Sequence, residues 1–180
     1  ERPFRGWQGY AVGTFSMFLS SFAVTIFALI VILGDTPWYS PQYAIPLLGL
    51  LLGNTMSGIA IAMDRLTQSA WEQRDTIEAR LMLGERWDVA IQTYRRQAVR
   101  SGLIPIINAM AAAGVVSLPG MMTGQILAGS PPYEAAKYQL MIMYLITAGT
   151  GFGSLAAVWL GSRHLFDARH RLRLERLKKR

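Results

Sequence analysis

The stretch YAVGTFSMFLSSFAVTIFALIVIL, Tyr10–Leu33, contains 24 residues and no charged side chain. An α-helix rises 1.5 Å per residue, so about 20 apolar residues cross a hydrocarbon core of about 30 Å. Further uncharged stretches occupy residues 43–63, 101–133 and 138–162. Of 180 residues, 52% are hydrophobic and 16% are charged, which is too apolar for one soluble domain. We therefore predict an all-α fold, a polytopic membrane helix bundle.

The basic residues predict how this bundle is oriented. We expect four transmembrane helices, at residues 10–33, 43–63, 103–129 and 138–161. Of the 18 Lys and Arg residues, 2 lie in segment 1–9, 7 in segment 64–102 and 8 in the basic tail 163–180. Because cytoplasmic loops carry an excess of Lys and Arg, both termini of this chain and segment 64–102 should face the cytoplasm.

The composition also excludes several classes of protein. There is no cysteine, which removes disulfide scaffolds, zinc fingers and iron–sulfur clusters. The sequence pI of about 10.1 is explained by contact with membrane lipids and needs no nucleic acid. A Walker A motif, a zinc-protease motif and a nucleophile elbow are all missing from the sequence. We expect this chain to be neither an ATPase nor a peptidase and to bind no cofactor of its own.

Segment 64–102 reads as a cytoplasmic helical hairpin. No proline lies between Pro46 and Pro105, so the second span can continue as helix to Leu83, where Gly84 supplies a stop. A second helix, from about residue 85 to residue 100, returns to the bilayer. Such an arm projects roughly 30 Å and suits a soluble partner. Trp87 at its tip is either an anchor for that partner or a cover for the hairpin's own apolar stripe.

The third predicted span is interrupted by Ser117-Leu118-Pro119-Gly120. Proline removes a backbone donor, so we expect local unwinding here, typical of a substrate path or gate, with a packed proline kink as the alternative. The candidate path residues are Asn54, Asn108, Ser117, Pro119, Gly120, Met121, Met122 and Gln125. A metal site is otherwise not visible, although the thioethers of Met121 and Met122 could bind a soft ion.

Three G-x-x-x-G pairs predict close helix packing. They are Gly49/Gly53, Gly120/Gly124 and Gly149/Gly153, each in a different predicted span. Small residues let helix backbones approach one another in lipid, where no hydrophobic force drives association. The pairs do not distinguish contacts within one copy from contacts between copies.

Several stretches resemble one family of membrane proteins. These are Val116–Gly129, which includes the SLPGMMTGQILAG sequence, Lys137-Tyr138-Gln139, and Ile45-Pro46-Leu47-Leu48-Gly49 with Gly53-Asn54. They resemble the FetB-type (YbbM-like) ABC transporter permeases, which are associated with iron export and are similar to plant aluminium-tolerance permeases. Members of that family are longer, so the resemblance implies that this chain matches their C-terminal portion or is a shortened form.

The resemblance implies a single ABC permease transmembrane domain, residues 1–180, in a bacterial plasma (inner) membrane. It implies a homodimer with a second permease copy, driven by two cytoplasmic ABC ATPase subunits that bind ATP and Mg. Glu78-Ala79-Arg80-x-x-x-Gly84 is similar to the docking loop of ABC importers, with Arg80 in place of alanine. The implied ATPase-docking residues are Glu78, Gly84, Glu85, Arg86, Trp87 and Asp88.

The leading hypothesis is therefore the membrane-spanning subunit of an ABC exporter for iron or another metal. Two alternatives are an ATP-independent channel or carrier, and a scaffold subunit that transports nothing. Co-purification of a subunit with a Walker motif separates the first from both others, and solute flux without nucleotide separates the second from the third.

Overall fold

The computed structural model describes residues 7–33, 41–113, 120–167 and 171–177. In chain order the elements are α1 (Trp7–Phe27), the π-helix η1 (Ala28–Leu33), α2 (Pro41–Glu72), α3 (Arg74–Met82), α4 (Trp87–Ala90), α5 (Gln92–Ala112), α6 (Gly120–Leu127), α7 (Pro132–Leu165) and the 3₁₀-helix η2 (Leu174–Arg176). An isolated antiparallel bridge pairs Phe166 with Leu172. The predicted all-α class is confirmed.

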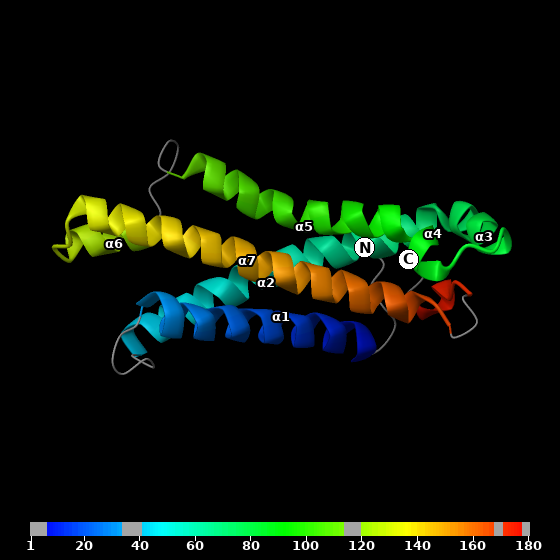
Figure 1. Ribbon diagram of the computed structural model, residues 1–180, viewed down its shortest axis with the longest axis horizontal. Coiled ribbons are helices and arrows are strands. Elements are labelled where there is room, and N and C mark those ends of the chain that lie inside the picture. Colours follow the sequence, from blue (N-terminus) through cyan, green and yellow to red (C-terminus); the bar gives the residue numbers. More distant parts are fainter. Residues whose placement is uncertain (1–6, 34–40, 114–119, 168–170, 178–180) are drawn as a thin grey trace.

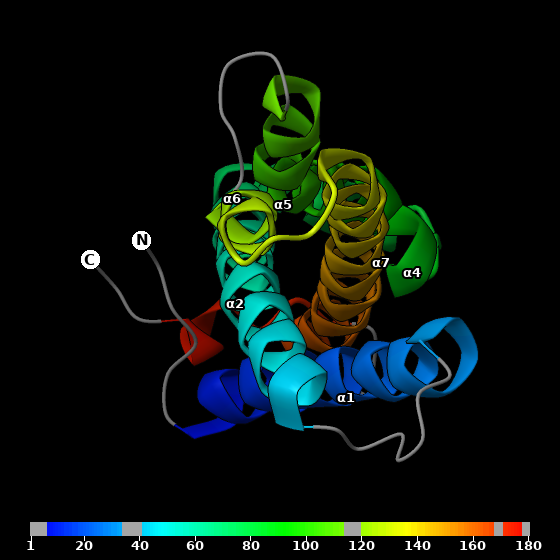
Figure 2. The same cartoon turned by 90° about the vertical axis from the view of Figure 1, so that its left-hand side faces the viewer.

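The long helices form one elongated bundle with α2 and α7 at its centre. Each of these two helices contacts the other and also contacts α1 and α5. Figure 1 shows α3, α4 and η2 at one end of the bundle and α6 at the opposite end. In the end-on view, α1 and α5 lie on opposite sides of the α2–α7 pair (Figure 2). The helical hairpin and the transmembrane bundle are therefore stacked along a single axis.

Three of the predicted spans are helices long and apolar enough to cross a membrane, among the residues that the structure describes. They are Ala11–Val31, Ala44–Glu72 and Pro132–Leu165. The fourth, predicted at 103–129, is not one helix, because α5 ends at Ala112 and α6 begins at Gly120. The expected unwinding at Ser117–Pro119 lies outside the described residues. The four-span count therefore stays a prediction, which α5 and α6 would have to satisfy together.

The hairpin follows the sequence expectation in outline. α2 continues past Met63 without interruption to Glu72, and α3 follows after Gln73. Gly84 ends this arm with φ +90°, a left-handed conformation that glycine adopts without a steric penalty. The returning helix comes in two pieces, α4 and α5. The cytoplasmic location of the hairpin stays a prediction.

Glycine allows the closest helix contacts, but not at all the predicted pairs. A Cβ atom on Gly153 would lie 2.7 Å from Thr55 Cγ2, and one on Gly149 would lie 2.9 Å from Leu51 Cδ2. By contrast, Gly49 and Gly53 have no such neighbour within 4 Å. Of the three predicted pairs, Gly149/Gly153 packs within this chain, whereas the faces that carry the other two remain open.

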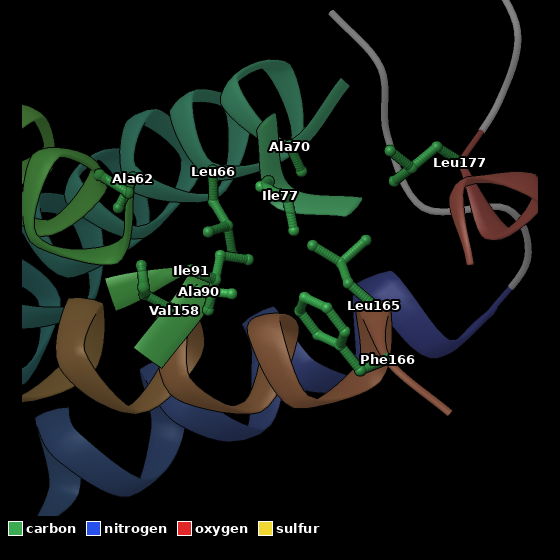
Figure 3. Packing of buried hydrophobic residues seen from close by; sticks show 11 residues of the cluster. Ala62, Leu66, Ala70, Ile77, Ala90, Ile91, Val158, Leu165, Phe166 and Leu177 are labelled. Carbon is green, nitrogen blue, oxygen red and sulfur yellow. The ribbon is translucent and has the colours of Figure 1, made fainter. Parts of the chain in front are cut away.

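A cluster of buried apolar residues, here called the hairpin-end cluster, joins the hairpin to α7 and the tail. Its members are Ala62, Leu66, Ala70, Ile77, Ala90, Ile91, Ala98, Val158, Leu165, Phe166 and Leu177. Figure 3 shows side chains from α2, α3, α4, α7 and the tail pointing into this one space. Burying an aliphatic or aromatic side chain contributes about 1.5–3 kcal/mol. The cluster therefore fixes the hairpin against the end of α7.

Candidate transport site and docking surface

The predicted path residues fall on two separate parts of the bundle. Asn54 is exposed on α2, where its Nδ2 atom donates a hydrogen bond to the Leu50 carbonyl oxygen at 2.8 Å, and Asn108 is exposed on α5. Gly120, Met121, Met122 and Gln125 lie on α6, which packs against α7. Ser117 and Pro119 lie outside the described residues. The structure therefore does not gather these residues into one described pocket.

Of the two candidate thioether ligands, Met121 packs against the apolar cluster that includes Leu47, Ile106 and Ile142. A metal-binding role for Met121 or Met122 stays a prediction. Within the described ranges, no three His, Asp or Glu side chains come together in a way that could hold a metal ion.

The structure reveals a line of buried hydroxyl groups where α1, α2 and α7 meet, here called the hydroxyl seam. It consists of Ser16, Ser20, Thr55, Thr150 and Ser154, all less than 9% exposed. A Cβ atom on Gly153 would lie 2.8 Å from Ser20 Oγ, one on Gly149 would lie 3.5 Å from Thr55 Oγ1, and one on Gly58 would lie 3.5 Å from Ser154 Oγ. These glycines therefore let hydroxyl-bearing residues of α1, α2 and α7 approach the backbone of a neighbouring helix closely.

Most hydroxyls of the seam have no hydrogen-bond partner. This holds for Ser16, Thr55, Thr150 and Ser154 among the described residues. A buried polar group without a partner costs about 1–3 kcal/mol, so the seam is a locally unfavourable part of an otherwise apolar bundle. At one edge it borders an open groove of about 570 Å³ between α1 and α7, which Ser16 and Ser20 help to line.

The seam is not among the features predicted from the sequence, although the sequence contains one signal for it. Ser16 and Ser20 are four residues apart, and so are Thr150 and Ser154. That spacing places each pair on one face of its helix. Which helices those faces meet is a long-range property that the spacing does not specify.

At the hairpin tip, the most exposed side chains are apolar. Met82 is 82% exposed and Leu83 is 85% exposed, and both directly precede Gly84. Of the predicted docking residues, Glu78, Glu85 and Arg86 are exposed around them, and the Arg86 guanidinium forms an ion pair with Asp88 at 3.2 Å. An exposed pair of this kind contributes little stability. Met82 and Leu83 therefore form an exposed apolar surface beside charged residues.

Trp87 points inward instead of toward solvent. Its ring lies 5.6 Å from the ring of Phe166, with the planes tilted by 38°. This contact agrees with the alternative in which Trp87 covers the hairpin's own apolar surface, with the difference that its aromatic partner comes from the tail. Contact of Trp87 with a docked partner stays a prediction. Met82 and Leu83 are the exposed apolar residues that sequence reasoning did not select.

The first part of the basic tail folds back on the bundle. The Arg173 backbone N–H donates to the Leu165 carbonyl oxygen at 2.8 Å, and the Asp167 N–H donates to the Arg171 carbonyl oxygen at 3.0 Å. Hydrogen bonds to Glu175 and Asp167 raise the pKa of the Arg173 guanidinium. This turn places Leu177 in the hairpin-end cluster. The tail is therefore part of the packed structure and not only a charged extension.

Comparison with known proteins identifies the family. The model of an uncharacterised protein family, UPF0014, matches residues 2–166. A UPF0014 membrane protein of Synechocystis is 40% identical over 168 residues, covering 93% of this chain and 62% of the relative. The probable iron export permease protein FetB of Escherichia coli is 33% identical over 167 residues, covering 90% of this chain and 64% of the relative.

A plant protein is related as well. Protein ALUMINUM SENSITIVE 3 of Arabidopsis thaliana is 31% identical over 142 residues, covering 79% of this chain and 51% of the relative. The chain thus spans less than two thirds of the length of these relatives. No solved structure matches it. The family model covers most of the sequence and agrees with the spans described above, so this chain belongs to the UPF0014 family of membrane proteins.

Proposed function

We propose that this chain forms part of the membrane-spanning permease subunit of an ABC exporter for iron or another metal, in a bacterial inner membrane. ATP and Mg bind to a separate cytoplasmic ATPase subunit, which docks on the helical hairpin, and a second permease copy completes the pathway. The observation that carries the proposal is the 33% identity to the FetB protein over 90% of this chain, in a fold that presents an exposed hairpin tip.

Docking is centred on Met82 and Leu83. Residues at the centre of an interface fill desolvated pockets of the partner and are surrounded by contacts that exclude water. The tip provides this arrangement, with Glu78, Glu85 and Arg86 around the two apolar side chains. Trp87 has an indirect role, because its ring packs on Phe166 and supports the tip without touching the partner.

The transport path lies along the open face of α2 and α5. Asn54 and Asn108 are exposed amides in apolar helices, and Gly49 and Gly53 on α2 leave room for close approach. Amides at membrane depth are favoured where another protein surface or a hydrated solute meets them. We place the second permease copy against this face, with α6 and the segment around Pro119 at the end of the path.

The hydroxyl seam is where the helices move during transport. Small side chains do not interlock, so α7 can shift against α1 and α2 without forcing large groups past one another. A shift would also bring the hydroxyls that lack partners to new hydrogen-bond acceptors or to water. The free-energy cost of the hydroxyls without partners in this state then favours the shift to the other state.

The test is transport of Fe(II) by proteoliposomes that contain the permease and its ATPase subunit. Replacing Met82 and Leu83 by Asp should abolish both co-purification of the ATPase and ATP-dependent flux. The matched control for docking is Leu127→Asp, which should leave co-purification of the ATPase unchanged, because Leu127 is 84% exposed but lies on α6 at the opposite end of the bundle. Unchanged flux in the double variant contradicts docking at the tip, and Fe(II) flux without the ATPase favours the channel or carrier alternative.

A further inference from the structure

A second groove lies between α5 and α7, at the hairpin end of the bundle, and it is not part of the proposed docking surface or path. Its volume is about 470 Å³. The residues that line it are Gln92, Arg95, Arg96, Val99, Arg100, Leu103, Ile107, Leu155 and Val158. The α5 members recur at intervals of three and four residues, so they form one continuous stripe along the helix. The stripe is basic at its N-terminal end and apolar toward its C-terminal end.

Three arginines, Arg95, Arg96 and Arg100, make up the basic end and are here called the groove arginines. The five ion pairs found among the described residues involve other cations, and none includes a groove arginine. Arg96 and Arg100 are exposed and Arg95 is half-buried. Guanidinium groups bind phosphate oxygens in a bidentate manner, so three of them on one helix face form a site for a phosphate.

The groove arginines lie at the level where charge begins on the neighbouring helices. Gly102 of α5 packs against Gly58 of α2. From that contact, Arg96 is about 9 Å farther along α5 and Arg65 is about 10 Å farther along α2, toward the same end. Arg65 is the first cation after the apolar part of α2. The groove arginines therefore lie at the depth of lipid headgroups.

The groove as a whole has about the length of one lipid leaflet. From Arg96 to Ile107, the α5 stripe extends about 16 Å, and half of a typical hydrocarbon core is about 15 Å. Along this length, the groove is lined by Val99, Leu103 and Ile107 from α5 and by Leu155 and Val158 from α7. A soluble phosphate would use only the basic end, whereas a phospholipid would use both ends.

We propose that this groove binds an anionic phospholipid, with its phosphate on the groove arginines and an acyl chain over Val99, Leu103 and Leu155. Charge complementarity selects an anionic headgroup, because three cations without acidic partners face a single phosphate. The bound lipid would join α5 to α7 next to the hairpin. This proposal depends on a membrane location but not on the identity of the transported solute.

The test is native mass spectrometry of the purified protein in detergent, titrated with phosphatidylglycerol and, in parallel, with phosphatidylcholine. Each basic residue near an anionic surface contributes about a fivefold gain in affinity, so changing all three groove arginines to Gln should weaken phosphatidylglycerol binding roughly a hundredfold. The matched control changes Arg74, Arg80 and Arg171 to Gln, which removes the same charge elsewhere and should have little effect. Lys at the three groove positions keeps the charge and should retain most of the binding.

Two further measurements distinguish a bound lipid from other ligands. Inorganic phosphate and glycerophosphoglycerol carry the headgroup chemistry without acyl chains and should not compete at the same concentrations. Ile107→Trp with Leu155→Trp fills the apolar end and should weaken lipid binding although the arginines are intact. Equal binding of phosphatidylcholine, competition by phosphate alone, equal loss in the control variant, or full binding by the Gln variant would each overturn the proposal.

Discussion

The contact between α2 and α5 at Gly102 gives the sharpest stability prediction. A Cβ atom at position 102 would lie 2.5 Å from the Gly58 carbonyl oxygen and 2.9 Å from Ala62 Cβ. Ordinary contact begins at 3.4 Å, so the first distance is 0.9 Å too short. The carbonyl oxygen belongs to a helix backbone and cannot rotate aside as a side chain can. Gly102→Ala must therefore push α2 and α5 apart.

The expected change in folding stability of Gly102→Ala is the difference between two opposing contributions. Overpacking a well-packed contact costs about 1–3 kcal/mol, and two short contacts place this site near the upper end. Replacing Gly by Ala inside a helix gains up to about 1 kcal/mol, which leaves a net destabilisation of about 2 kcal/mol. Gly53→Ala is the control, because a Cβ atom there meets nothing within 4 Å and only the gain remains.

Equilibrium unfolding of both variants in mixed micelles measures the difference. Gly102→Ala should be less stable than Gly53→Ala by about 3 kcal/mol, or roughly a hundredfold in the unfolding equilibrium constant. Equal stability of the two variants would show that α2 and α5 do not approach each other at Gly102, and the bundle described above would be wrong at its central contact.

Three further predictions concern the seam, the path and the tail. Thr55→Val and Ser154→Ala remove buried hydroxyls without partners, so each should raise the free energy of unfolding by about 1 kcal/mol while slowing Fe(II) transport. A lower free energy of unfolding would show that these hydroxyls do have partners in the folded protein. Asn54→Leu should leave unfolding unchanged, because this exposed amide bonds only within its own helix, but should reduce flux in proteoliposomes. Phe166→Ala should cost about 3–5 kcal/mol, and a double-mutant cycle with Trp87→Ala should show a coupling of about 0.5–1.5 kcal/mol, measured by thermal unfolding.

The structural features that could be predicted from the sequence are those that depend on residues close together in the chain. The absence of charge over about 20 residues marks α1, α2 and α7 as spans, since length and composition are local properties. The stop at Gly84 is local as well, because a left-handed residue ends a helix whatever surrounds it. For the same reason, the continuation of α2 past Met63 could be read from the absence of proline.

What the sequence did not predict depends on residues far apart in the chain. Trp87 could face a partner or its own protein, and Phe166, whose ring it contacts, lies 79 residues later. The position of the seam hydroxyls where α1, α2 and α7 meet is likewise a property of packing. The exposure of Met82 and Leu83 was not predicted either, because it depends on which residues of the folded chain lie near the turn at Gly84.

The arrangement of the clusters shows how a push at the hairpin tip would reach the middle of the membrane. Ile77 of α3 and Leu165 at the end of α7 are both completely buried in the hairpin-end cluster, so displacement of the tip moves the end of α7 with it. α7 is one uninterrupted helix of 34 residues, about 51 Å long, and a helix of this kind moves as a rigid body. Halfway along it, Thr150 and Ser154 face α2 across the hydroxyl seam, where small side chains resist sliding least. A force applied by a soluble partner would therefore produce its largest rearrangement at the seam and not at the point of contact.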